Sequence, residues 1–362
     1  MKTKTSFIGR LLAFVGLRRP GGSPADRGNQ TAANDDFAFK LLKQIARDQP
    51  EANIFISPYS ASTALQMVAN GAAGETKEEM ELVLGTSSAG LNEANRDVVQ
   101  SLNSENDSVI LEIANSIWYR QGAQINPEFL ACNQRYFGAT VAPLNFADPH
   151  SVDIVNTWAG EKTHGRITRI ADGMIDPVNG RLLLANAVYF KGKWSDPFES
   201  RATRDRPFYL QDGRQKTVPM MAMSKTFTYQ HGTRYQAVRL PYKGENLAMY
   251  VFLPDEKSSP EKLLSTMNGD AWQRSVKPGF AQEDGDLQLP KFKIEYTVEL
   301  ARPLQKLGMK TAFDMNKANF SGISLEPSLH ISGALQKTFV EVKEEGTEAA
   351  AVTVAANSGM PA

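Results

Sequence analysis

Apolar residues recur at helical spacing in the first third of the chain. Over residues 34–49, Phe37, Leu41 and Ile45 fall on one helical face, behind acidic residues that suit a helix N-terminus. The segment 152–170 shows a similar face that includes Trp158. Each pattern predicts an amphipathic helix packed against a core.

Capping residues mark the starts of three more helices. Ser57 followed by Pro58 suits a helix N-terminus, because serine caps the free backbone N–H groups and proline fits the first turn. Thr76 and Glu79 have the spacing of a capping box. The dipeptide at 126–127, Asn-Pro, predicts another helix start.

Strand-like alternation dominates the rest of the chain. The run 181–194 (RLLLANAVYFKGKW) is almost continuously apolar, which is typical of a strand buried on both faces. Other strands are predicted over 109–121, 218–230, 235–254, 287–300 and 331–346. Helices come first, strands follow, and no repeating βα unit appears, so the fold class is α+β.

The composition excludes several kinds of partner. The 362 residues include 40 Lys and Arg and 40 Asp and Glu, with a formal net charge of zero. The basic residues are scattered, so we expect no nucleic acid and no membrane as a partner. We expect protein or small-molecule partners instead.

Residues 1–34 differ from the rest. Lys2 and Lys4 precede a short apolar stretch that Arg10 interrupts, and a region rich in Gly, Pro, Arg and Asn follows. The stretch is too short to span a bilayer. Two interpretations remain open: a weak export signal, or a flexible leader. In either case one domain is expected over residues 35–362.

No catalytic signature is present. The chain has no phosphate-binding loop, nucleophile elbow, dinucleotide fingerprint or zinc-protease motif. The four histidines are widely spaced, so we expect no catalytic residue, no metal site and no cofactor. Cys132, the only cysteine, lies in a predicted helix and is interpreted as a packing residue. The sequence does not indicate an enzyme.

The chain's last stretch, EVKEEGTEAAAVTVAANSGMPA over 341–362, has a glycine followed by small and β-branched residues. Together with NIFISPYSASTAL, LLLANAVYFKGKW, VPMMAM, AVRLPYKGENLAMYVFLP and LPKFKIE, it resembles the serpins in order and spacing. The likeness runs from about Asp35 to Val354, and EEGTEAAA with ANAVYFKGKW is its most specific part.

The resemblance implies a serpin fold of three β-sheets with about nine surrounding helices. It also implies a serine endopeptidase inhibitor, monomeric and extracellular, that acts as a suicide substrate. In the inhibitory members a protease cleaves an exposed loop, and the freed loop inserts as a new central strand. The alternatives are a non-inhibitory carrier, binding protein or chaperone, and a cytoplasmic location.

The hinge of this loop is assigned to eight consecutive residues: Glu344, Glu345, Gly346, Thr347, Glu348, Ala349, Ala350 and Ala351. In the register that the family implies, Thr347, Ala349, Ala351 and Thr353 would face the core. These side chains are small and uncharged, so a closing sheet can accept them. Gly346 is expected to supply backbone freedom.

Two more groups of residues carry over from the family by position. The resemblance implies a polar cluster that governs sheet opening, formed by Asn53, Ser57, Ser60, Asn186 and Gln336. Many members have histidine where this chain has Gln336. Trp194 matches the aromatic residue where insertion begins, and Lys291 is a candidate partner of Glu344. The alternative for these two residues is ordinary packing and a surface ion pair.

The family's usual spacing places the scissile bond at Met360–Pro361. Most serine proteases accept proline poorly after the cleaved bond, so the true bond is also placed upstream, at Val354, Ala355, Ala356 or Ser358. These small residues suit an elastase-like or subtilisin-like serine protease, and a cysteine protease is a further candidate.

Family members continue beyond the loop with apolar strands that join the other two sheets. This sequence contains no such strands after Ala362. We expect either that it is the large piece of a cleaved serpin or that it is a fragment. A free-standing chain of this kind is expected to aggregate, because core strands would lack partners.

Overall fold

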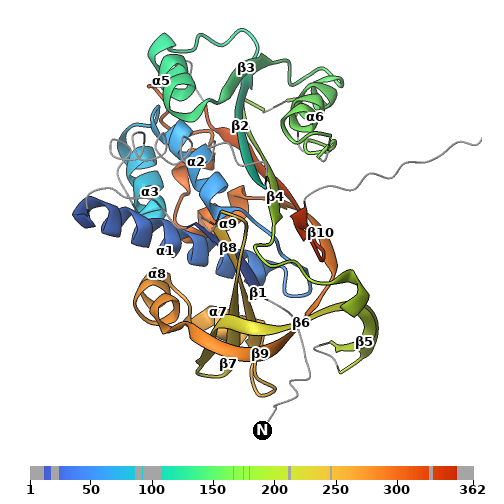
Figure 1. The fold of residues 1–362 in the computed structure, drawn as a ribbon. Helices are drawn as coiled ribbons and strands as arrows, with labels where there is room; N and C mark the ends of the chain where they lie inside the picture. Colours follow the sequence, from blue (N-terminus) through green and yellow to red (C-terminus); the bar gives the residue numbers. More distant parts are fainter. Residues whose placement is uncertain are drawn as a thin grey trace, which may run out of the picture.

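Figure 1 shows the fold in a computed structural model that describes residues 12–17, 24–85, 92, 108–165, 167–173, 175–178, 180–210, 213–244, 247–325 and 329–348. The helices are α1 (Pro24–Asp48), α2 (Pro58–Ala69), α3 (Gly74–Leu84), α5 (Pro127–Phe137), α6 (Ser151–Lys162), α7 (Pro260–Thr266), α8 (Gly269–Ala271) and α9 (Ala301–Leu307). Short 3-10 turns lie at Ser200–Ala202, Lys277–Gly279 and Thr311–Phe313, and a π turn lies at Trp272–Val276. 

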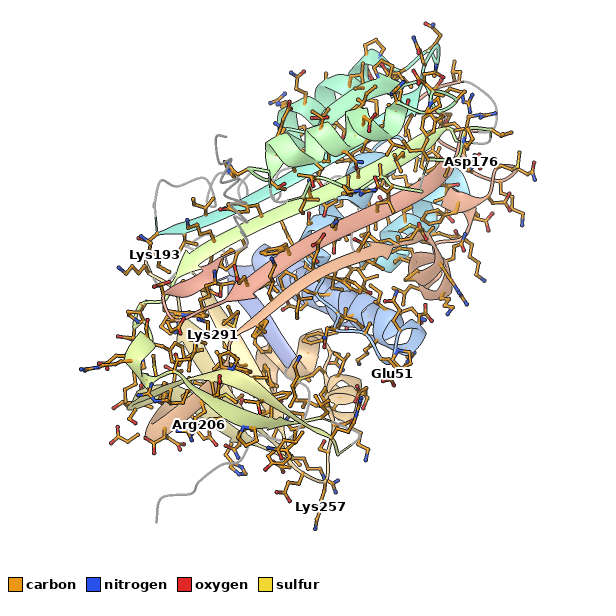
Figure 2. The ribbon with its side chains drawn as sticks, turned by 90° about the vertical axis from the view of Figure 1, so that its right-hand side faces the viewer. Glu51, Asp176, Lys193, Arg206, Lys257 and Lys291 are labelled. Atoms are coloured by element: carbon orange, nitrogen blue, oxygen red, sulfur yellow. The ribbon has the colours of Figure 1, made fainter. Side chains whose placement is uncertain are left out.

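One of the two sheets contains both parallel and antiparallel strands, and we call it the central sheet. Its strand order is β10-β11-β12-β4-β2-β3, and β4 and β11 also pair directly. The bounds are β2 (Val109–Arg120), β3 (Thr140–Leu144), β4 (Leu182–Lys193), β10 (Phe292–Glu299), β11 (Ile331–Val342) and β12 (Gly346–Glu348). Figure 2 shows the long strands running from Asp176 at one end toward Lys193 and Lys291 at the other.

The prediction that β4 is buried on both faces is confirmed. Leu182 and Leu184 pack into a core shared with α1, α2 and α3. Leu183 and Ala185 point the other way, into a core shared with α6. An apolar run without alternation is therefore what this central strand requires.

The remaining strands form a second sheet in the order β1-β8-β7-β6-β5, with β9 also paired to β6. Their bounds are β1 (Leu12–Leu17), β5 (Arg204–Tyr209), β6 (Gln215–Gly232), β7 (Tyr235–Pro241), β8 (Leu247–Pro254) and β9 (Ala281–Pro290). Because the 18-residue β6 pairs with β5, β7 and β9, two of the three expected sheets are continuous here.

Local signals predicted most helix starts. The side chain of Ser57 accepts a hydrogen bond from the backbone N–H of Ser60, with proline at the first turn of α2. Asn126 caps α5 in the same way. The predicted capping box of Thr76 and Glu79 does not form. α3 begins at Gly74, and Glu79 instead accepts hydrogen bonds from Thr311. A tertiary contact thus takes the carboxylate that the local pattern assigned to a cap.

The N-terminal region is more regular than the sequence indicates. α1 begins at Pro24, ahead of the start predicted near Asn34, and Leu12–Leu17 forms a strand. Residues 24–33 carry no apolar period, so helical patterning could not locate that first part of α1. No helix among the described residues has the length and apolar character needed to cross a membrane.

Candidate functional site at the seam of the central sheet

The seam is the line along which β4 and β11 meet. The two strands pair in parallel from Leu182 opposite Ile331 to Val188 opposite Thr338. Beyond this point they separate, and β12 lies between them, antiparallel to both. The seam is therefore closed along most of its length and already holds an added strand at one end.

Thr347 anchors β12 in the seam. It lies opposite Val342 on one side and Gly192 on the other, and it is only 1% exposed. Its hydroxyl lies 2.7 Å from the hydroxyl of Tyr242, which is fully buried. Thr347 thus occupies the inward position expected for it. Burial also raises the pKa of Tyr242.

The structure gives Gly346 a steric role. Its φ does not lie in the left-handed region. A Cβ atom there would lie 2.1 Å from the carbonyl oxygen of Gly192 and 2.8 Å from the Cα of Lys193. Glycine is needed because the backbones of β12 and β4 approach closely, not because the turn needs unusual torsion angles.

Trp194 holds the segment that leads into β12. Its indole nitrogen donates to the carbonyl oxygen of Lys343 at 3.0 Å, and its backbone N–H donates to Glu345, also at 3.0 Å. The indole stacks on the ring of Tyr242, with centroids 4.6 Å apart and planes 12° apart. The predicted aromatic residue therefore contacts the segment that leads into β12. Sequence reasoning missed Tyr242, whose segment looked like an ordinary hairpin turn.

Glu344 is a nearly buried carboxylate beside this anchor. It is 7% exposed, its Oε2 lies 2.8 Å from the ammonium of Lys291, and the Thr203 hydroxyl donates to its Oε1 at 2.8 Å. Burial alone would raise its pKa, but the hydrogen bonds from Lys291 and Thr203 outweigh burial and hold the pKa below its ordinary value. The structure therefore brings together the pair that the sequence suggested.

A pH dependence follows from this ion pair. A carboxylate with a depressed folded-state pKa stabilises the fold above its unfolded pKa, about 4.3, and this contribution is lost as the pH falls through the folded value. In Lys291→Met the contribution is absent at neutral pH. We expect the variant to melt below the parent at pH 7 and the gap to narrow toward pH 3, measured by circular dichroism.

The control for this prediction is Lys216→Met, which removes an exposed lysine from β6. Its melting temperature should follow the parent at every pH. If the difference in melting temperature between Lys291→Met and the parent stays constant from pH 7 to pH 3, the pKa of Glu344 does not depend on Lys291.

The polar cluster lies deeper along the seam, where β4 and β11 are in contact. The side chain of Gln336 accepts from the backbone N–H of Ser57 at 2.8 Å and donates to its carbonyl oxygen at 2.9 Å. It also donates to Asn186 at 3.1 Å, and Asn186 donates to Ser60. One glutamine thus connects both strands of the seam to the start of α2.

Two residues change the membership of this cluster. Asn186 also donates to the side chain of Asn115 on β2 at 2.7 Å, so the network reaches a third strand. Asn115 was not predicted, because nothing in its local pattern marks it. Asn53 lies exposed, and among the described residues no hydrogen bond connects it to the cluster. We therefore correct the predicted set by adding Asn115 and omitting Asn53.

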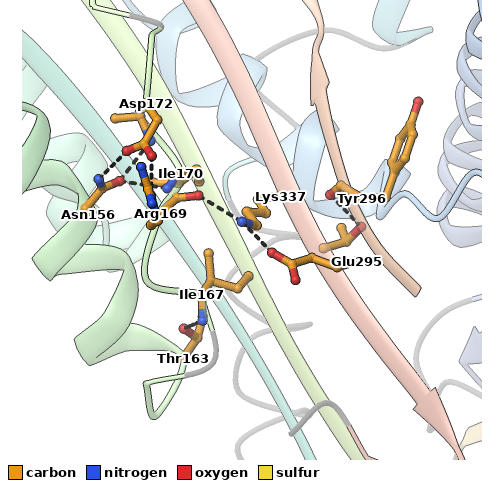
Figure 3. Close-up of polar contacts among 11 residues, drawn as sticks. Asn156, Thr163, Ile167, Arg169, Ile170, Asp172, Glu295, Tyr296 and Lys337 are labelled. Carbon is orange, nitrogen blue, oxygen red and sulfur yellow. Dashed lines mark hydrogen bonds and ion pairs between the residues drawn. The ribbon is translucent and has the colours of Figure 1, made fainter. Parts of the chain in front are cut away.

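A covering segment lies over the opposite face of the seam, formed by α6 and residues 167–172 (Figure 3). Lys337 of β11 donates to the carbonyl oxygen of Arg169 at 2.9 Å and pairs with Glu295 of β10. Asn156 of α6 accepts from the backbone N–H groups of Ile170 and Ala171 at 2.7 and 2.9 Å. Separating β4 from β11 therefore requires this segment to move.

The rest of the loop assigned from the sequence lies outside the described residues. This applies to Ala349, Ala350, Ala351, Val354, Ala355, Ala356, Ser358, Met360 and Pro361, and also to the side chain of Glu348. Cys132 lies in α5 as predicted, and burial raises the pKa of its thiol, which disfavours the reactive thiolate. No group of His, Cys, Asp and Glu suited to a metal ion occurs in the described part of the chain.

Comparison with known proteins identifies the family of this chain. A family model described as "Serpin (serine protease inhibitor)" matches residues 32–362. The leukocyte elastase inhibitor of Bos taurus is 36% identical over 333 residues, which covers 89% of this chain and 88% of that protein.

Two solved structures show the same fold. Native protease nexin-1 with heparin superposes with a TM-score of 0.83 at 30% identity and covers 92% of each chain. Ovalbumin from emu (Dromaius novaehollandiae) has a TM-score of 0.81 at 28% identity, covering 90% of this chain and 92% of that one. The relatives named as inhibitors are not enzymes. The resemblance and the α+β fold are thus confirmed, and the chain belongs to the serpin family of serine protease inhibitors.

Proposed function

We propose that this chain inhibits a serine endopeptidase as a suicide substrate, by inserting its cleaved loop along the β4–β11 seam. The observation that carries this proposal is the position of β12. Its residues already pair with both strands of the seam, and Thr347 already fills an inward position. Continuing the same strand would require β4 and β11 to separate along their direct ladder and the next residues to follow the register of β12.

Backbone pairing favours such an insertion. The direct contact between β4 and β11 is one parallel ladder, whereas an inserted strand makes two antiparallel ladders, which are slightly more stable per residue. The inserted residues lose about 1–2 kcal/mol each in backbone entropy. Each hydrogen bond of the inserted strand contributes a net stabilisation of about 0.5–1.5 kcal/mol, which roughly offsets this entropy cost. Burial of the inserted side chains must therefore supply the net driving free energy. The small residues after Thr347 suit that burial.

The proposed target is an elastase-like or subtilisin-like protease. Small residues follow the hinge, and one relative carries the name leukocyte elastase inhibitor. We also propose a single domain, a monomeric state and an extracellular location. Met360–Pro361 is the proposed reactive bond, with the upstream positions as its alternatives.

The test is incubation with pancreatic elastase, subtilisin and trypsin, followed by denaturing electrophoresis. We expect an SDS-resistant complex with elastase or subtilisin, and N-terminal sequencing of the released peptide should identify a bond between Val354 and Pro361. Cleavage without any trapped protease, and with no rise in melting temperature, would reject the proposal. That result would favour the alternative of a non-inhibitory carrier or chaperone.

A further inference from the structure

Two arginines lie opposite each other at one end of the central sheet. The last pair of the β2–β4 ladder in this direction is Tyr119 opposite Leu182. At the next position the backbone N–H of Arg120 donates to the carbonyl oxygen of Arg181 at 3.0 Å. Opposite residues of an antiparallel pair have Cβ atoms about 5 Å apart, and like charges there destabilise the pair. The sheet thus places two guanidinium groups where their charges repel each other.

Both side chains converge on the same two backbone carbonyl groups. Arg120 donates from Nε to the carbonyl oxygen of Gly180 at 2.8 Å and from Nη2 to that of Val178 at 3.0 Å. Arg181 donates from Nη1 to the same two oxygens, at 3.1 and 3.3 Å respectively. The central carbon of the Arg120 guanidinium also lies 5.8 Å from the centre of the Phe146 ring. Both guanidinium groups are therefore held close together in defined orientations.

The two carbonyl groups belong to a hydrogen-bonded turn. The backbone N–H of Gly180 donates to the carbonyl oxygen of Asp176 at 3.1 Å, and the Asp176 carboxylate accepts from the backbone N–H of Val178 at 2.9 Å. The backbone N–H of Arg181 donates to the Ser332 hydroxyl of β11 at 3.2 Å. The arginine pair therefore lies at the end of the seam remote from β12, near Asp176 in Figure 2.

The positive charge of this pair is only partly balanced. Burial lowers the pKa of the Arg120 guanidinium, the charge of Arg181 lowers it further, and Asp176 opposes both effects. Two guanidinium groups and one carboxylate leave a net positive charge at this turn. A guanidinium carries more N–H donors than these carbonyl contacts use, so donors on both side chains remain for a ligand.

We propose that Arg120 and Arg181 form a binding site for a tetrahedral oxoanion, a phosphate or sulfate group, at the Asp176 end of the central sheet. An oxoanion between two opposite arginines replaces their repulsion with two attractions, and charge-assisted hydrogen bonds from arginine to such groups are strong. The shared carbonyl groups orient both guanidinium groups before a ligand arrives, so little side-chain entropy is lost on binding. The bound anion would connect β2, β4 and the turn at Asp176.

Isothermal titration calorimetry of the full chain with inorganic phosphate tests the site. Sodium chloride keeps the ionic strength constant, because salt screens exposed charges. We expect saturable binding by the parent. Arg120→Gln and Arg181→Gln should each weaken this binding at least about tenfold, because each removes one guanidinium fork. Arg206→Gln is the control, because it removes an exposed arginine from β5, and it should bind phosphate as the parent does.

Thermal melting separates ligand binding from a purely structural role of the two arginines. Added phosphate should raise the melting temperatures of the parent and of Arg206→Gln, because a ligand that binds the folded state stabilises it. The melting temperature of Arg181→Gln should not respond to phosphate. Arg181→Lys keeps the charge but loses the fork, so it should also bind phosphate more weakly than the parent, and it serves if glutamine prevents folding.

Titrations with inorganic sulfate and with O-phosphoserine identify the source of the anion. Binding of the inorganic anions alone indicates a free oxoanion, and additional binding of O-phosphoserine indicates a phosphate group carried by a larger molecule. If phosphate binds the parent and both glutamine variants equally, it is an adventitious ion only and the proposal is wrong. Absence of binding to the parent by phosphate and sulfate would also overturn it. No protease is involved, so these outcomes are independent of inhibitory activity.

Discussion

Thr347→Arg is expected to abolish inhibition while leaving cleavage of the loop intact. The side chain at this position is 1% exposed, and it lies between β4 and β11 against the hydroxyl of Tyr242. We expect the intact hinge of this variant to leave the sheet and expose the guanidinium, whereas a fully inserted strand must bury it between β4 and β11. Burying an unpaired charge costs several kcal/mol, which corresponds to a change of about a hundredfold or more in the balance between trapping and release.

The measurement is the number of inhibitor molecules consumed per protease molecule trapped, read from denaturing gels. The parent should trap the protease at a ratio near one, and Thr347→Arg should be cleaved with almost no complex. Glu345→Arg is the matched control, because the same new residue enters two positions earlier at an exposed site. Equal trapping by Thr347→Arg and the parent would show that this inward position is not used in insertion.

Among the substitutions proposed here, Gln336→Ala is expected to lower the free energy of unfolding most. Gln336 is fully buried, and its amide makes three hydrogen bonds, two with the backbone of Ser57 and one with Asn186. Alanine leaves these groups without their partner and creates a cavity at the seam. Each unsatisfied buried group costs about 1–3 kcal/mol, so we expect the free energy of unfolding to fall by at least about 3 kcal/mol.

Equilibrium unfolding in urea measures this loss, and the rate of self-association on mild heating reports easier opening of the seam. Gln215→Ala is the control, because Gln215 is an exposed glutamine in β6. Its stability should stay within about 0.5 kcal/mol of the parent. If Gln336→Ala unfolds at the same urea concentration as Gln215→Ala, the cluster does not hold the seam closed.

The amino-acid sequence by itself determined the class of the fold and the identity of its central strand. The starts of α2 and α5 followed from Ser57 and Asn126, because a cap acts on backbone groups only two or three residues away. The burial of β4 on both faces followed from a run of apolar residues without alternation. The hinge EEGTEAAA together with ANAVYFKGKW identified the family. All of these signals are local, so they can be read along the chain.

Only the tertiary structure decided which side chains meet at the seam. Tyr242 reaches Thr347 across 105 residues, and Gln336 reaches Ser57 across 279 residues. No periodicity encodes such contacts, because they depend on how distant strands align. The same limit explains why Glu79 binds the turn at Thr311 instead of capping its own helix. Local energies set the elements of this protein, and long-range packing chose the partners of its buried polar groups.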